Sequence, residues 1–390
     1  MLVNEYALTV ARGPTRAPYD HGAVAVIDGQ TIKFTPFRTA NVPPPMAMCE
    51  LEVESPAIDV AFAMDCSSMA VLHRAGVSFF TLETKSARLL TPRLLFTASL
   101  NKTTAQMYEE SLFEIAYSSP SEVQVLQMAE ELELLRHQLA DEPGTWWNTD
   151  ARAIATITSP DSTEVEGVVT QHLLGRLACI SGGEHSPQSV QFPIFLPWSS
   201  YTTYHKELIA FGLSRNGHLY ANSRQLAKNC TSFLVTESHL IFTTSNHFVK
   251  FVHLAAAEGK SCDPWKPNER TLTILDLDVP PDDPEKDERC RSIERGGRLV
   301  TAMPTKMSLV LQMPRGNLET IYPRAMVLAG IRKLTEGKDY GSAFATCRTQ
   351  RVDMNILFDH RPEQFLENVG LFLDQVKDPA NIDLFLSTLK

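Results

Sequence analysis

The feature of this sequence that most constrains its fold is a unit of short apolar segments and polar turns that recurs along the chain. Residues 22–29 (GAVAVIDG) are apolar and end in Asp-Gly, a strong signal for a tight hairpin turn. Residues 30–37 then alternate between apolar and polar positions, as a half-buried strand does. Related units recur at residues 57–82, 208–221, 233–252 and 298–321. The pattern predicts a succession of short antiparallel strands.

Repeated short antiparallel strands over residues 1–321 predict a β-propeller of six or seven blades. Each blade buries its two faces against its neighbours in the ring, which leaves few open sheet edges. The repeat signature is degenerate, because Gly217-His218 is a single Gly-His pair and the sequence contains no Trp-Asp dipeptide. A large β-sandwich or a pair of barrels is the alternative.

Two stretches within this region do not follow the strand pattern. Residues 127–139 (QMAEELELLRHQL) have apolar positions that suit either an amphipathic helix or a pair of strands, and the sequence leaves both open. Residues 280–289 (PPDDPEKDER) carry no large apolar side chain apart from their prolines. We therefore expect a disordered loop between strands there.

The pattern changes to helical spacing at residues 322–390. Pro323 suits the first position of a helix and Gly337 suits its end, and a second apolar stripe follows at residues 340–347. Pro362 opens a third predicted helix, and Asp378-Pro379 opens a fourth. Short helices with single apolar stripes predict the beginning of an α-solenoid, with a small terminal bundle as the alternative. The predicted fold class is mainly β, a propeller over 1–321 followed by α-helices over 322–390.

Composition narrows the classes of protein that fit. The chain has 390 residues, 43% of them hydrophobic, and a net charge of −10, which argues against a dedicated nucleic-acid binder. No apolar run approaches the length of a membrane-spanning helix, and the first residues lack the layout of a signal peptide. The scattered cysteines indicate reduced thiols in a cytosolic or nuclear protein: Cys49, Cys66, Cys179, Cys230, Cys262, Cys290 and Cys347.

Catalytic and cofactor motifs are scarce in the sequence. It has no glycine-rich dinucleotide or phosphate-binding loop and no Gly-x-Ser-x-Gly nucleophile turn. The few patterns that could hold a ligand are Ser-Gly-Gly at 181–183, His247 with His253 or His239, Asp276 with Asp278, and Trp146-Trp147. Ordinary surface or packing roles explain each of them better, so we expect no catalytic residue, no bound cofactor and no metal site.

Positive charge gathers in one part of this acidic chain. Residues 315–351 carry seven basic side chains against the acidic Glu319, Glu336 and Asp339, a net charge of +4. The basic residues are Arg315, Arg324, Arg332, Lys333, Lys338, Arg348 and Arg351. They could form a contact surface for RNA or for an acidic partner, or they could be ordinary solvated helix faces.

Several long segments closely resemble one family. They are residues 24–45, residues 295–304 (RGGRLVTAMP), residues 309–321 (LVLQMPRGNLETI) and residues 353–366 (DMNILFDHRPEQFL). The chain is similar through them to subunit 1 of the Elongator complex, the large scaffold of a tRNA-modifying assembly. The resemblance implies a non-catalytic scaffold that binds the propeller-built second subunit and the catalytic third subunit. It also implies carboxymethyl-type modification of the wobble uridine of tRNA, in the cytoplasm and the nucleus.

The same resemblance limits what this chain is expected to contain. The family has two propellers, a long α-solenoid and a dimerisation region with a basic tRNA-binding segment, and its iron–sulfur, S-adenosylmethionine and acetyl-CoA chemistry belongs to the third subunit. This chain is expected to be a fragment covering the second propeller and the start of the solenoid, without the region that forms the homodimer.

The sequence leaves two rival functions open. One is a propeller–solenoid scaffold of a vesicle coat or nuclear pore. The other is an enzyme with carboxylates or metal ligands converging at the centre of a propeller.

Overall fold

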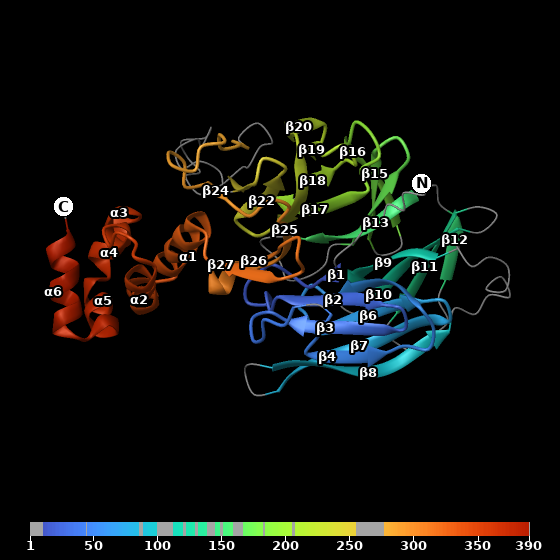
Figure 1. The fold of residues 1–390 in the computed structure, drawn as a ribbon, viewed down its shortest axis with the longest axis horizontal. Coiled ribbons are helices and arrows are strands. Elements are labelled where there is room, and N and C mark those ends of the chain that lie inside the picture. The colour runs from blue at the N-terminus through green and yellow to red at the C-terminus, as the bar shows by residue number, and fades with distance from the viewer. Residues whose placement is uncertain are drawn as a thin grey trace. The chain divides into compact units, whose positions relative to one another are not determined.

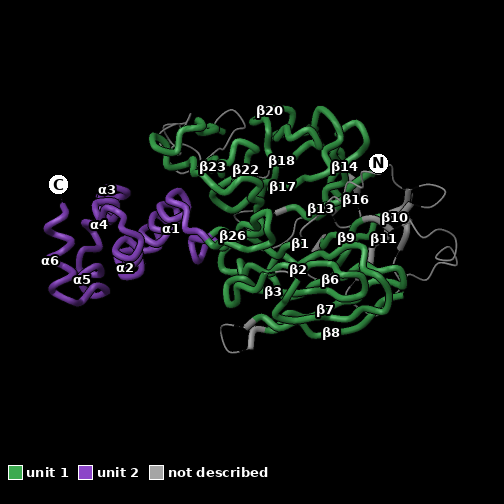
Figure 2. Tube along the Cα trace, in the orientation of Figure 1, with its two compact units in different colours: residues 1–303, 309–320 green, residues 304–308, 321–390 purple. Residues whose placement is uncertain are grey.

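The structure is a computed structural model that falls into two compact units (Figure 2). Unit 1 comprises residues 1–303 and 309–320 and is built of strands, and unit 2 comprises residues 304–308 and 321–390 and is mainly helical. The described residues are 11–43, 45–85, 89–99, 112–119, 122–128, 132–138, 145–148, 151–158, 167–181, 184–204, 207–254 and 277–389. No helix among them is long and apolar enough to cross a membrane.

The first three blades of unit 1 are antiparallel sheets whose strands follow chain order (Figure 1). They are β1 (Ala11–Arg12), β2 (Ala23–Asp28), β3 (Thr31–Pro36) and β4 (Cys49–Glu52); β5 (Ala57–Phe62), β6 (Ser68–His73), β7 (Gly76–Lys85) and β8 (Leu89–Ser99); and β9 (Leu112–Ser119), β10 (Glu122–Met128), β11 (Leu132–Gln138) and β12 (Thr145–Asn148).

The next two blades are joined into one eight-stranded sheet. They contain β13 (Ala151–Thr158), β14 (Val168–His172), β15 (Arg176–Ser181) and β16 (Glu184–Gln191), and β17 (Trp198–Tyr204), β18 (Glu207–Leu213), β19 (Leu219–Ala221) and β20 (Arg224–Ala227). The two halves meet only through a short parallel pairing of Ile157 with Tyr201 and Thr158 with Thr202. Because each half is otherwise antiparallel, we describe them as separate blades whose first strands touch.

The last two blades are a four-stranded and a three-stranded sheet. They contain β21 (Cys230–Val235), β22 (His239–Thr244), β23 (Phe248–His253) and β24 (Cys290–Ser292), and β25 (Arg298–Met303), β26 (Ser308–Gln312) and β27 (Leu318–Ile321). The described strands thus make seven blades, which agrees with the predicted propeller.

The ring closes where the last blade meets the first. Val24 of the first blade shares a buried apolar cluster with Val300, Met303 and Val310 of the last. Gly22, with φ of +64°, lies so close that a Cβ atom there would stand 2.7 Å from the Met303 sulfur. A side chain at this position would be strained by the positive φ and would displace the Met303 side chain. The closure excludes the alternative of separate sandwiches or barrels.

Apolar side chains between neighbouring blades form the core. Ile32 and Phe34 of the first blade and Val60, Phe62 and Met69 of the second belong to one buried cluster. The rings of Phe34 and Phe62 lie 6.4 Å apart. Burying a large apolar side chain contributes about 1.5–3 kcal/mol, so these interfaces supply much of the stability of the ring.

The two irregular stretches behave differently from each other. The ambiguous stretch at residues 127–139 is strand, because β10 and β11 pair in antiparallel register from Glu122 opposite Gln138 to Met128 opposite Leu132. The prediction of disorder at residues 280–289 is wrong. The buried Nζ atom of Lys250 donates to the Pro280 carbonyl oxygen and pairs with Asp282, both at 2.6 Å. An ion pair and a hydrogen bond to a backbone carbonyl fix this segment against β23. The prediction considered only the lack of apolar side chains, so it missed these polar contacts.

Unit 2 contains six α-helices and one short 3₁₀ helix among its described residues. They are η3 (Pro304–Lys306), α1 (Arg324–Glu336), α2 (Tyr340–Gln350), α3 (Ile356–Asp359), α4 (Pro362–Glu367), α5 (Val369–Val376) and α6 (Pro379–Thr388). The single third helix predicted from Pro362 onward is wrong. It breaks into α4 and α5 at Asn368, whose side-chain amide donates to the Gln364 carbonyl oxygen at 2.7 Å. The short α3 was not predicted.

Candidate functional site

The candidate ligand patterns of the sequence do not assemble into a metal site. The described residues contain no cluster of three or more His, Cys, Asp or Glu side chains able to hold a metal. His247 lies in the turn before β23, whereas His239 and His253 face each other across β22 and β23 with ring centroids 4.7 Å apart. Cross-strand register, and not the spacing of His247 and His253, therefore brings histidines together.

The structure describes only some of the residues of the other candidate ligand patterns. Asp278 pairs with Arg289 at 2.8 Å, and Asp276 and residues 182–183 lie outside the described residues. Trp146 and Trp147 occupy successive positions of β12, opposite Leu135 and Leu134 of β11.

The seven predicted basic residues are divided between the two units. Arg315 lies in the turn between β26 and β27 of unit 1, and the other six lie in unit 2. Arg324 of α1 donates to the carbonyl oxygen of Arg351, just past the end of α2, at 3.3 Å. Arg348 donates to Asn381 of α6 at 2.6 Å. These contacts give arginines near the C-terminal end of α2 a part in joining helices.

The other basic residues lie toward the connection between α1 and α2. Arg332 and Lys333 are exposed in the second half of α1, and Lys338 is exposed in the turn that follows. The six basic residues of unit 2 thus lie on α1, on α2 and in the turns that follow these two helices. That any of them contacts RNA or a partner stays a prediction.

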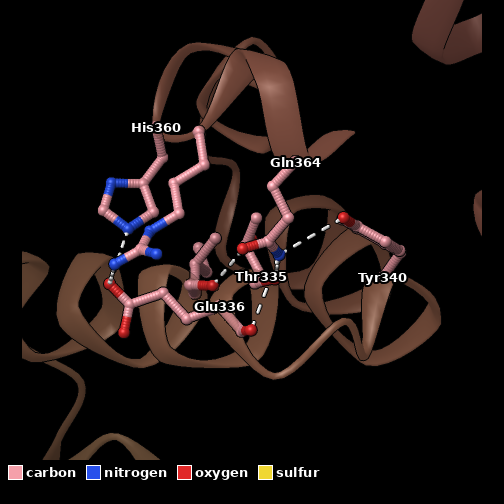
Figure 3. A network of polar contacts seen from close by, with 7 residues as sticks. Thr335, Glu336, Tyr340, His360 and Gln364 are labelled. Carbon is pink, nitrogen blue, oxygen red and sulfur yellow. Dashed lines mark hydrogen bonds and ion pairs between the residues drawn. The ribbon is translucent and has the colours of Figure 1, made fainter. Parts of the chain in front are cut away.

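A polar network joins the end of α1 to the start of α4 (Figure 3). The Glu336 carboxylate at the end of α1 lies 3.0 Å from the Nε2 atom of His360 and 3.3 Å from the guanidinium of Arg361. The side-chain amide of Gln364 donates to the Thr335 carbonyl oxygen at 2.8 Å and lies 3.5 Å from the Tyr340 hydroxyl. The Thr335 carbonyl oxygen also accepts from the backbone N–H of Lys338 at 3.0 Å, so Gln364 is its second donor and links α4 to the end of α1.

The network gives a structural reason for the segment DHRPEQF at residues 359–365. Its histidine, arginine and glutamine bind the end of α1, and its phenylalanine enters the core of unit 2. Tyr340 lies beneath, fully buried, with its ring edge-on to Phe365 at 5.4 Å. In the sequence, this segment stood out only because it resembles the family. Its residue types alone did not predict these contacts.

Replacing Gln364 with alanine should destabilise unit 2 by about 0.5–1.5 kcal/mol, because the hydrogen bond between α4 and the Thr335 carbonyl oxygen would be lost while that oxygen keeps the Lys338 N–H as a donor. Hydrogen exchange of α1 and α4 should accelerate, while that of the propeller strands should not. Glu363→Ala, at the exposed neighbouring position, is the matched control. Equal exchange in the two variants would contradict the assigned role of Gln364.

Two carboxylates inside unit 1 were missed by the sequence analysis. Asp59 of β5 accepts from the backbone N–H of Ile115 in β9 at 3.0 Å, and Glu114 of β9 accepts from that of Ile154 in β13 at 2.7 Å. Each side chain therefore ties the first strand of one blade to the first strand of the next. The signal was an acidic residue in an otherwise apolar strand, AIDVAF and LFEIAYSS.

The surroundings of these carboxylates favour the protonated form. Burial raises the pKa of Asp59 to about 6 and that of Glu114 to about 7, and the charge of Asp59 further raises the pKa of Glu114. Their hydrogen bonds to backbone amides act against this shift. Both carboxylates accept from the backbone of the neighbouring blade, which fits a structural role.

Comparison with known proteins matches both units. Residues 26–300 match the family model of the ELP1 N-terminal second beta-propeller, and residues 324–390 match that of the ELP1 alpha-solenoid. Elongator complex protein 1 of Saccharomyces cerevisiae is 32% identical over 99% of this chain, and that of Schizosaccharomyces pombe is 32% identical over 96%. The mouse protein of that name is 26% identical over 98%. The chain spans 28% of each yeast relative and 31% of the mouse relative.

Proposed function

Since this chain belongs to the Elongator complex protein 1 family, we propose that it serves that complex as a scaffold, without catalysing a reaction itself. The observation that carries the proposal is the match of both units, in order, to the propeller and solenoid models of this one family. A fold alone does not define a function, since propellers and solenoids serve many proteins. The family match also favours this role over a vesicle-coat or nuclear-pore scaffold.

The finer part of the proposal concerns the reaction that the scaffold supports. We infer that the assembly modifies the wobble uridine of tRNA, and that the catalytic third subunit carries the chemistry and its cofactors. This chain would position that subunit and the propeller-built second subunit, and tRNA would bind to the assembled complex. The cytoplasm, and also the nucleus, is the proposed location. We also propose that the assembly contains the homodimer of the family.

Affinity purification of the tagged protein tests the scaffold role. We expect it to isolate the other Elongator subunits, and recovery of coat or nuclear-pore proteins in their place would contradict the proposal. Replacing the segment of the full-length protein that corresponds to this chain with an unrelated linker should abolish carboxymethyl-type wobble uridines, measured by mass spectrometry of digested tRNA. Unchanged modification would show that this part of the scaffold is dispensable.

The purified chain should bind neither S-adenosylmethionine nor acetyl-CoA. The sequence offers no phosphate-cradling loop and no cysteine cluster for an iron–sulfur centre. Isothermal titration calorimetry should detect no heat of binding for either compound, with the purified catalytic subunit as the positive control. Stoichiometric binding of either compound would assign this chain a direct part in the chemistry.

A further inference from the structure

Two neighbouring turns at the last blade each carry an arginine. Glu294 to Gly297 form one turn, closed by the Gly297 N–H bonding to the Glu294 carbonyl oxygen at 3.0 Å. Met313 to Gly316 form the other, closed in the same way at 2.9 Å. Arg295 occupies a central position of the first turn and Arg315 a central position of the second.

The two turns touch through a glycine. Gly296 has a φ of +81°, and a Cβ atom on it would stand 2.9 Å from the Pro314 ring. A side chain here would clash with the second turn, so the glycine allows the two arginine-bearing turns to approach. Both turns belong to segments of the family resemblance, RGGR and MPRGN, whose arginines have no part in the core.

These arginines are free to meet a ligand. Arg295 and Arg315 are exposed, as is Arg298 at the start of β25. Within the part of the chain that the structure describes, none of the three side chains forms a hydrogen bond or an ion pair. This contrasts with Arg289 of the same unit, which is bonded to Asp278 and Asp287.

We propose that Arg295, Arg298 and Arg315 form a docking surface for an acidic peptide segment of a partner protein. The planar guanidinium group matches the geometry of a carboxylate and bonds it with two N–H groups. Two abutting turns hold the arginines on short, hydrogen-bonded backbone, which reduces the ordering that binding requires. The inference gives the proposed scaffold a class of partner, and its test is independent of tRNA modification.

The small number of arginines on this surface favours a short acidic peptide over a nucleic acid. Glu294 and Glu319 are exposed in or beside the same two turns, and the chain as a whole carries a net charge of −10. Nucleic-acid affinity grows with the number of phosphates that basic residues neutralise. A small group of arginines bordered by glutamates suits a short ligand with a few separated carboxylates.

Fluorescence anisotropy with the whole chain tests the surface, using a labelled ten-residue oligoglutamate peptide as the probe. We expect binding at low salt that weakens as salt increases. The double variant Arg295→Glu/Arg315→Glu should bind the peptide about tenfold or more weakly, because two attractive contacts become repulsive. Circular dichroism should show that the variant keeps its fold, since both positions are exposed.

The matched control is Arg215→Glu. Arg215 is also an exposed arginine at a central position of a turn in unit 1, closed by Gly217 N–H and the Ser214 carbonyl oxygen at 3.0 Å. The affinity of the Arg215→Glu variant for the peptide should stay within about twofold of that of the unmodified chain. The proposal fails if the unmodified chain does not bind the peptide, or if the control loses as much affinity as the double variant. It also fails if labelled decauridylate binds more tightly at the same arginines, since the partner would then be a nucleic acid.

Discussion

Phe365→Ala should unfold unit 2 while leaving the propeller folded. The ring of Phe365 lies 5.4 Å from that of Tyr340, 5.2 Å from Phe372 and 5.7 Å from Phe385. Removing the Phe365 ring would leave these three aromatic side chains without their common packing partner and would create a cavity. The expected loss in the free energy of unfolding is about 3–5 kcal/mol. A helical unit of about 70 residues has little more stability than this to lose. Far-ultraviolet circular dichroism should show a loss of helical signal with the strand signal retained.

The adjacent leucine provides the control for this experiment. Leu366 is 63% exposed, although it follows Phe365 directly on α4. Leu366→Ala should change the free energy of unfolding by no more than about 0.5 kcal/mol, as expected for surface positions. Similar losses in the two variants would mean that general helix propensity, and not the aromatic core, holds unit 2 together.

How far the sequence predicts this structure depends on how local each determinant is. The turn at Asp28-Gly29 is encoded by two adjacent residues, and β2 and β3 pair around it with Asp28 opposite Thr31, as expected. The apolar stripes of α1 and α2 follow a fixed period within one helix, so they too were predictable. The segments that resemble the family, such as residues 309–321, further predicted that a propeller is followed by solenoid helices.

The determinants that the sequence analysis missed depend on residues far along the chain. Asp59 bonds to an amide 56 residues away and Glu114 to one 40 residues away, so neither partner can be identified from spacing. The contact of Gly296 with Pro314 depends on how two turns of the last blade fold together. The break at Asn368 interrupts an apolar period that continues through it, because a side-chain hydrogen bond competes with the helix backbone.

Glu114→Gln should remove part of the pH dependence of the propeller's free energy of unfolding. The folded state raises the pKa of Glu114 to about 7 from its ordinary value of 4.5, so it binds a proton more tightly than the unfolded chain does. This contribution to stability is complete below about pH 4 and is lost as the pH rises through about 7. A neutral glutamine still offers an oxygen to the N–H of Ile154 and carries no charge to bury.

The glutamine variant should therefore gain stability relative to the unmodified protein as the pH rises. Between pH 5 and pH 8 the difference in unfolding free energy should move in its favour by about 1–3 kcal/mol, since each pKa unit corresponds to about 1.4 kcal/mol. Urea unfolding at the two pH values measures it, with the exposed Glu319→Gln as the control that should show no such change. Asp59 carries the same kind of shift, to a pKa of about 6, so the variant should retain part of the pH dependence. A difference that is equal at the two pH values would mean that the folded ring does not raise the pKa of Glu114, so that the hydrogen bond from Ile154 offsets the whole cost of burying the carboxylate.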